Sequence, residues 1–195
     1  SAEGDLTDLN CSIQPYAVYH DISLRDYLQT LLDIHNEQVE EDRRFVLGNI
    51  TVEDPNDSLY RYSTYESTYT TITDRLVNRL GGYLVVRYGA DGIRYLDYLK
   101  EYGRVSGQTI AYGKNLTDFS VSTSTADLAT VLVPLGAKLE DANGNLTEER
   151  LTVAAANNGS IFIEDTEAIE QYKSRIVKTV IYDDVTLAEN LLKKG

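Results

Sequence analysis

The sequence predicts an α+β fold in which two helices pack on an antiparallel sheet, followed by a β-rich part with short helices. Three observations predict this class. Apolar residues recur at helical spacing in two segments, 23–41 and 68–80. Segment 83–98 alternates in polarity around a Gly-rich turn, which is typical of a β-hairpin. After Gly103 the chain changes to short β-like runs that Gly and Asn turns separate.

The first helix is predicted over residues 23–41. Ser23 can cap it, and Asp26 lies three residues further on, as in a short capping box. Its last turn is expected in "EEDRR", where the helix dipole tolerates the cations Arg43 and Arg44. The stripe that should face the core consists of Leu24, Tyr27, Leu28, Leu31, Ile34 and Val39.

Residues 1–20 show no periodicity, which favours a tail or an entering strand. The chain contains no methionine, and its opening "SAEG" resembles a cloning remnant, so we expect a piece of a longer protein.

A strand is predicted in "RFVLGNITVED", where Gly48 can form a bulge. The second helix, 68–80, should end at the Gly81-Gly82 pair.

The hairpin at 83–98 turns at "GADG". A loop of two residues and a loop of four place the same side chains of the second strand on each face of the hairpin. The residues on both faces can therefore be predicted. The more apolar face, expected against the helices, carries Leu84, Val86, Tyr88, Ile93, Tyr95 and Asp97. The other face carries Tyr83, Val85, Arg87, Arg94, Leu96 and Tyr98. A face rich in Tyr and Arg is typical of a protein contact surface, and a half-exposed sheet is the alternative. The candidate contact residues are Tyr83, Arg87, Arg94 and Tyr98.

Residues 105–195 are predicted to form the β-rich subdomain, after a first subdomain over 21–104 and a boundary between Gly103 and Gly107. Short strands are expected in "QTIAYG", "DFSVSTS", "LATVLVPLGAKLE", "ERLTVAAA", "SIFIED" and "RIVKTVIYD". Asn143-Gly144 is a hairpin turn signal.

Two short helices are predicted in the same subdomain. Asp165 or Thr166 can cap a helix that runs to Tyr172. Thr186 and Glu189 form a capping box for the last helix, "LAENLLKKG".

Composition excludes several functional classes. A net charge of −13 argues against a nucleic-acid-binding or anionic-membrane surface. It suits a surface past which DNA slides, and plain solubility is the alternative explanation that we favour. No apolar run approaches the roughly 20 residues of a membrane span. Cys11 is the single cysteine, which rules out an internal disulfide and an all-cysteine metal site.

The two histidines, His20 and His35, are too few for a His-rich metal site, and we expect His35 to be a partly exposed helix residue. A Cys11–His20 pair lacks an orienting third group and an oxyanion hole. We therefore expect no catalytic residues, no cofactor and no metal site.

Several ordered blocks of the chain resemble successive blocks of one phage family. They begin with "SLRDYLQTLLDIHNEQVEEDRRFVLGNITV" and "YSTYESTYTTITDRLVNRLGGYLVVRY", and they continue through "ATVLVPLGAKLE" and "LTVAAANNGSIFIEDTEAIEQY" to "NLLKKG". The similarity covers roughly residues 20–195. The family is the tail-tip protein of siphophages and prophages of Gram-positive bacteria, also called prophage endopeptidase tail, phage minor structural protein or tail-associated lysin.

The resemblance implies a baseplate-hub-like fold and a homotrimeric ring that closes the tail tube. It implies contacts with the tail tube and with other tail-tip proteins, and a place at the virion tail tip after assembly in the bacterial cytoplasm. Peptidoglycan cleavage in such proteins belongs to separate carboxy-terminal modules with Cys–His or zinc sites, and this chain has neither residue set. Two alternatives stay open: a peptidoglycan hydrolase, which needs a Cys or His in a cleft, and a carbohydrate-binding module, for which the absence of Trp is adverse.

Overall fold

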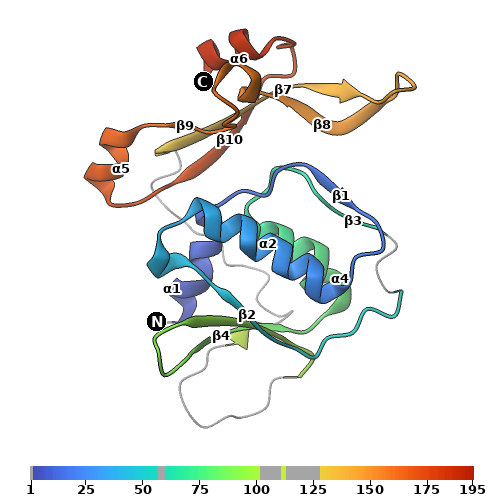
Figure 1. Cartoon of the computed structure of the whole chain (residues 1–195), viewed down its shortest axis with the longest axis vertical. Coiled ribbons are helices and arrows are strands. Elements are labelled where there is room, and N and C mark those ends of the chain that lie inside the picture. Colours follow the sequence, from blue (N-terminus) through green and yellow to red (C-terminus); the bar gives the residue numbers. More distant parts are fainter. Residues whose placement is uncertain (1, 57–59, 102–110, 113–127) are drawn as a thin grey trace. The chain divides into compact units, whose positions relative to one another are not determined.

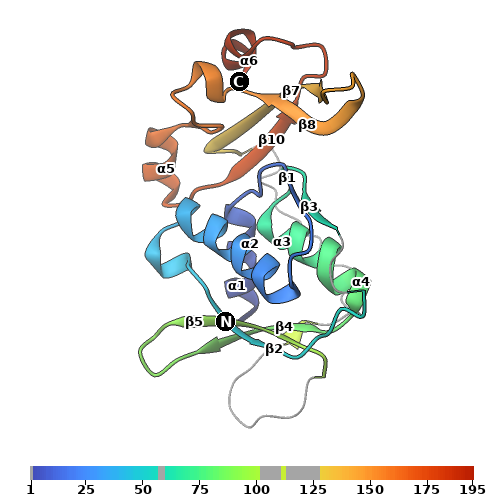
Figure 2. The same cartoon turned by 45° about the vertical axis from the view of Figure 1, so that its right-hand side comes forward.

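The computed structural model describes residues 2–56, 60–101, 111–112 and 128–195 (Figures 1 and 2). The described residues form an α+β fold, as the sequence predicts. The chain divides into two compact units, Ser1–Ser122 and Thr123–Gly195. The predicted boundary at 103–107 lies outside the described residues. Within the described part, no helix has both the length and the apolarity that crossing a membrane requires.

The first unit combines helices with a two-stranded ribbon and a four-stranded sheet. Its helices are α1 (Ala2–Thr7), the 3₁₀-helix η1 (Asp8–Cys11), α2 (Leu24–Gln38), the 3₁₀-helix η2 (Glu41–Arg43), α3 (Thr68–Ile72), the π-helical η3 (Thr73–Val77) and α4 (Asn78–Leu80). Its strands are β1 (Ala17–Tyr19), β2 (Val46–Ile50), β3 (Arg61–Ser63), β4 (Tyr83–Tyr88), β5 (Arg94–Leu99) and β6 (Ala111–Tyr112). The ribbon is β1–β3, and the sheet has the order β2-β5-β4-β6.

Helix α2 begins as predicted and ends earlier. The Ser23 hydroxyl oxygen accepts a hydrogen bond from the Asp26 amide at 3.0 Å, so Ser23 caps the helix. The predicted end near residue 41 is wrong, because the helix stops at Gln38 and η2 follows as a separate turn. The Asn36 side chain bonds both backbone polar groups of Phe45, at 2.8 and 2.9 Å, and these bonds secure the returning chain against the helix.

The second predicted helix is confirmed as the continuous run α3–η3–α4, residues 68–80. Ser67 caps it by accepting from the Thr70 amide at 3.1 Å. Gly81 and Gly82 end it with φ angles of 75° and 88°, the left-handed region that glycine adopts without steric cost.

The sheet is mixed, which corrects the prediction of an antiparallel one. The hairpin β4–β5 is antiparallel, and β6 pairs antiparallel with β4. Strand β2, however, pairs parallel with β5. Its register shifts between Leu47 and Ile50, so a β-bulge spans Gly48, as predicted. Because β6 belongs to this sheet, the first unit extends beyond residue 104.

The face assignment is right for β4 and wrong for β5. The Gly89 amide donates to the Ile93 carbonyl at 2.8 Å, so three residues form the loop, not two or four. An odd loop length reverses the parity of the second strand. Leu84 therefore lies opposite Tyr98 and Tyr88 opposite Arg94, and opposed residues share a face.

The core of the first unit lies between the helices and one face of the sheet. Its members include Leu24, Leu28, Leu31, Ile72, Leu76, Leu84, Val86, Leu96 and Tyr98. Leu6 and Leu9 belong to the same core, with 2% and 0% exposure. Residues 2–11 are therefore not a tail, whereas β1 is an entering strand that pairs with β3.

The second unit is a smaller mixed sheet with short helices. Its strands are β7 (Val131–Glu140), β8 (Leu146–Thr152), β9 (Ile163–Glu164) and β10 (Val177–Ile181), and its helices are the 3₁₀-helix η4 (Ala154–Ala156), α5 (Thr166–Tyr172) and α6 (Ala188–Lys194). Strand β7 is central, with β10 parallel to it and with β8 and β9 antiparallel. A separate core contains Val153, Val185 and Leu191. The strand expected in "DFSVSTS" lies outside the described residues.

The local signals in this unit are mostly confirmed. Gly144, with φ 81°, completes the β7–β8 turn, and its amide donates to the Asp141 carbonyl at 3.0 Å. Asp165 caps α5 by accepting from the Ala168 amide at 2.9 Å. The capping box at Thr186 is wrong, because α6 begins after Leu187 without a side-chain cap.

Candidate functional site

The four candidate contact residues do not share one surface. Tyr83 and Arg87 lie on the sheet face that points away from the helices, where Tyr83 is half-buried and Arg87 exposed. Arg94 and Tyr98 lie on the opposite, core face, with exposures of 8% and 0%. The predicted contact face is therefore wrong as a single surface, because the odd loop turns the second strand over.

Arg94 and Tyr98 act as internal cross-links. Arg94 Nη1 donates to Asp8 Oδ2 at 2.8 Å, and the Arg94 guanidinium lies 4.3 Å from the centre of the Phe45 ring. This ion pair joins the hairpin to the turn after α1. The Tyr98 hydroxyl donates to the Gly81 carbonyl at 2.7 Å, and burial raises the pKa of Tyr98. Both side chains stabilise the fold, and because they are buried they cannot contact another protein.

On the other face, Asp97 organises the edge where β2 joins the sheet. Arg87 Nε lies 3.1 Å from Asp97 Oδ2, and its guanidinium lies 4.6 Å from the centre of the Tyr95 ring. The other carboxylate oxygen of Asp97 accepts the Asn49 amide at 2.7 Å. Asp97 is only 4% exposed, so the paired charges are a structural clamp with one exposed partner, Arg87.

Cys11, His20 and His35, the residues that a hydrolase could use, have different neighbours in the structure. The Cys11 sulfur accepts a hydrogen bond from Arg43 Nη1 at 3.2 Å. The His20 ring lies 5.6 Å from the Tyr60 ring, centre to centre. His35 is fully buried, which corrects the prediction of a partly exposed helix residue. Within the described residues, no group of three or more His, Cys, Asp or Glu side chains could hold a metal ion.

His35 takes part in a buried chain of hydrogen bonds. Its Nε2 lies 3.0 Å from the Arg43 carbonyl, which can only accept, so Nε2 carries the proton. Its Nδ1 therefore accepts from the Ser12 hydroxyl at 2.6 Å, and Ser12 lies 2.6 Å from the Thr68 hydroxyl. Burial lowers the pKa of His35. A Ser–His contact can serve nucleophilic catalysis, but these three side chains are all 0% exposed, so no substrate reaches them.

An exposed aromatic group that the sequence interpretation missed lies on the β1–β3 ribbon. Val18 is paired with Tyr62. Just beyond the ends of the two strands, the ring of His20 lies beside the ring of Tyr60. The Tyr60 ring lies 5.4 Å from the Tyr62 ring, and Tyr60 is 50% exposed. We call His20, Tyr60 and Tyr62 the aromatic face. The alternation in "YAVYH" and "YRYSTY" is the signal that could have revealed it.

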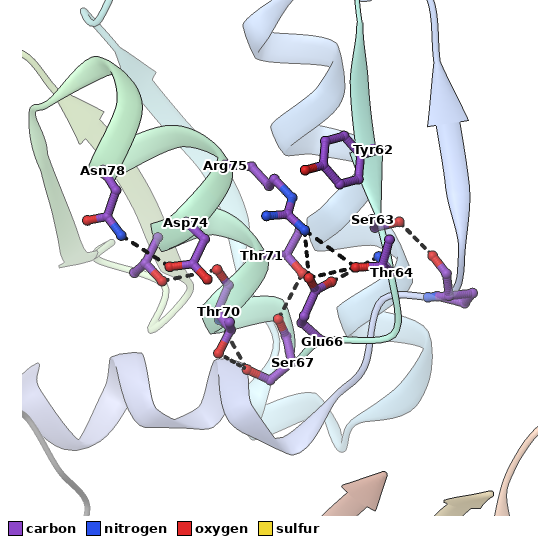
Figure 3. A network of polar contacts seen from close by, with 12 residues as sticks. Tyr62, Ser63, Thr64, Glu66, Ser67, Thr70, Thr71, Asp74, Arg75 and Asn78 are labelled. Carbon is purple, nitrogen blue, oxygen red and sulfur yellow. Dashed lines mark hydrogen bonds and ion pairs between the residues drawn. The ribbon is translucent and has the colours of Figure 1, made fainter. Parts of the chain in front are cut away.

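A polar network that includes Arg75 and Glu66 lies next to Tyr62 (Figure 3). The Arg75 guanidinium lies 4.2 Å from the centre of the Tyr62 ring. Arg75 Nη2 donates to Glu66 Oε1 at 2.6 Å, and Glu66 also accepts from the Thr64 amide at 2.9 Å and its hydroxyl at 2.7 Å. Burial alone would raise the pKa of Glu66, but the bonds from Thr64 and the charge of Arg75 lower it overall. The ring that Arg75 supports is thus part of a rigid corner between β3 and α3.

Comparison of the chain with protein-family models, with curated proteins and with solved structures gives no match.

Proposed function

We propose that this chain is a structural component of a phage or prophage tail tip, where it acts as a baseplate-hub-like protein in host attachment and DNA delivery. The ordered sequence blocks that resemble tail-tip proteins support this proposal. The structural observation that carries it is the use of buried ionisable groups as cross-links between distant segments. His35, Arg94 and Asp97 are each almost fully buried and bonded to residues far away in the sequence.

Such an arrangement favours assembly over catalysis. Catalytic groups lie in clefts where substrate can reach them, and their pKa values are adjusted for proton transfer. His35 has the lowered pKa that burial causes, yet both ring nitrogens are bonded inside the protein. The chain is therefore proposed to have no enzyme activity of its own.

The aromatic face is our candidate for contact with a neighbouring subunit, in place of the face that the sequence predicts. Aromatic rings give a large contact area at low cost in conformational entropy, and they are enriched in protein interfaces. Tyr60 is 50% exposed, and Arg75 fixes its neighbour Tyr62. A homotrimer in the intact protein would use this face.

Analytical ultracentrifugation of the intact protein tests the assembly. We expect trimers for the natural protein and for a Tyr172→Ala control, which changes a tyrosine that is 47% exposed in the second unit. His20→Ala combined with Tyr60→Ala should shift the protein towards monomers. Unchanged trimers in this double variant would remove the aromatic face from the interface, and a monomeric natural protein would contradict the trimer.

A lysis assay separates this proposal from the hydrolase alternative. The chain should not clear a peptidoglycan suspension, with or without zinc. Clearing that disappears in a Cys11→Ser variant would contradict the structural role and favour a hydrolase.

A further inference from the structure

Two neighbouring hollows are lined by residues from the start of α2, the end of α4 and the segment after β2. Figures 1 and 2 show these three segments near one another at one end of the first unit. Their volumes are about 390 and 680 Å³. Both are lined by Asp54, Pro55 and Leu80, so they adjoin each other. Volumes of this order are typical of sites for small ligands.

The charge of this region is opposite to that of the whole chain. Four cations line the hollows, Arg25, Arg61, Arg79 and Lys100. Among the described residues that line the hollows, the carboxylates are Glu53 and Asp54, and Arg61 pairs with Asp54 at 2.7 Å. The chain as a whole has 18 basic and 31 acidic residues. A local excess of cations against such a background attracts anions.

Three of these cations are available to a ligand. Arg25, Arg79 and Lys100 are exposed, and within the described part of the chain their side chains form no hydrogen bond or ion pair. A bound anion would therefore not have to displace a partner from the described part of the chain. By contrast, the Arg61 side chain is only 5% exposed, and its buried Nε has no hydrogen-bond partner among the residues that the structure describes. Arg61 thus adds a buried positive charge, and the N–H at its Nε is a donor that a ligand could use.

Two more features point to the kind of anion. The larger hollow is lined by the first residues of α2, a 15-residue helix, and the positive end of a helix dipole favours negative charge. The smaller hollow is lined by Tyr60, a residue that is 50% exposed and whose ring can pack against the apolar face of a sugar ring. Charge and aromatic surface therefore lie side by side.

We propose that the two hollows bind a sugar or polyol that carries a phosphate group. Arg79, Lys100 and Arg25 would bind the phosphate oxygens, since guanidinium groups match phosphate geometry with paired hydrogen bonds. Tyr60 would pack against the sugar, and because Tyr60 also belongs to the aromatic face, the ligand and a neighbouring subunit would compete for it. This inference does not rest on the tail-tip proposal, and the test below measures binding alone.

An NMR titration of the ¹⁵N-labelled chain tests the site, with glucose 1-phosphate as the probe. We expect saturable shifts of the backbone amides of Arg25, Arg79 and Lys100. Glucose and inorganic phosphate, titrated separately, should each bind more weakly because each supplies half of the contacts. Equal affinity for inorganic phosphate would overturn the choice of a sugar phosphate, and so would tighter binding of a short DNA oligonucleotide.

Charge-reversal variants locate the binding. Arg79→Glu with Lys100→Glu should weaken binding of glucose 1-phosphate about tenfold or more, since two charge-assisted bonds are lost. Lys173→Glu with Lys193→Glu makes the same change of net charge at exposed positions of the second unit and should leave the affinity unchanged. Equal losses in both double variants, or no saturable shift in the natural chain, would overturn the proposal.

Discussion

His35 shows how one buried side chain makes stability depend on pH. Its ring is bonded on both sides, to Ser12 and to the Arg43 carbonyl, and only the neutral form fits both bonds. Burial lowers its pKa below the ordinary value of 6.5. Among the charges near it, Asp8 favours protonation and Arg94 opposes it, but burial has the largest effect.

The pH dependence follows from this lowered pKa. Below pH 6.5 the unfolded chain binds a proton that the folded chain resists, so the free energy of unfolding decreases as the pH falls. His35 can contribute at most about 1.4 kcal/mol per pH unit, and its stabilising effect is complete above pH 6.5. Urea denaturation between pH 5 and pH 8 measures this slope.

A His35→Gln variant should show a flatter slope below pH 6.5. It should also be less stable at pH 8 by about 1–3 kcal/mol, because the Ser12 and Arg43 bonds are disturbed. His20→Gln, at an exposed histidine, is the matched control. An identical slope in natural and His35→Gln chains would show that other groups cause the pH dependence.

At the scale of elements, the join between β2 and β5 depends on a glycine. A Cβ atom at Gly48 would overlap the Asp97 carboxylate and approach the Leu96 carbonyl to 3.2 Å. Asp97 cannot retreat easily, since it accepts from the Asn49 amide and from Arg87. The bulge, the glycine and the buried carboxylate therefore form one unit.

Gly48→Ala should destabilise the chain by about 1–3 kcal/mol, the usual cost of overpacking. In an Asp97→Ala background the same substitution should cost less, because the clashing carboxylate is gone. A double-mutant cycle of urea midpoints measures this coupling. Additive effects would mean that the clash with Asp97 does not determine the need for glycine.

At the scale of the whole molecule, the two units have separate cores. Leu9 lies in the first and Leu191 in the second, and both are 0% exposed. Units with their own cores can unfold separately. We therefore expect two calorimetric transitions.

Matched Leu→Ala substitutions test this expectation. Leu9→Ala should lower one transition, at a cost of about 2–5 kcal/mol, and Leu191→Ala should lower the other. Leu146→Ala, at a side chain that is 69% exposed, should change neither by much. A single transition that both buried variants shift equally would show that the units unfold together.

The sequence by itself determined the fold class and most of the local elements. Ser23 and Asp165 cap helices, and Gly81-Gly82 ends one, because each signal acts through bonds to nearby backbone groups. The Asn143-Gly144 turn is local for the same reason. The alternation of the hairpin strands was also correct, since side chains alternate in any strand.

Only the tertiary structure decided which side chains meet. The Gly89–Ile93 hydrogen bond closes a loop of three residues, and this loop length decides which side chains of β5 point to the core. As a result, Tyr83 and Arg87 lie on one face of the sheet, and Arg94 and Tyr98 lie on the other. The docking of residues 2–11 depended on apolar burial and on the Arg94–Asp8 pair, 86 residues apart. The aromatic face required β1 and β3 to pair across a long connection. These contacts join segments that are far apart in the sequence, and no local sequence pattern shows which distant segments will meet. The positions of the candidate contact residues and of the aromatic face therefore depended on tertiary packing.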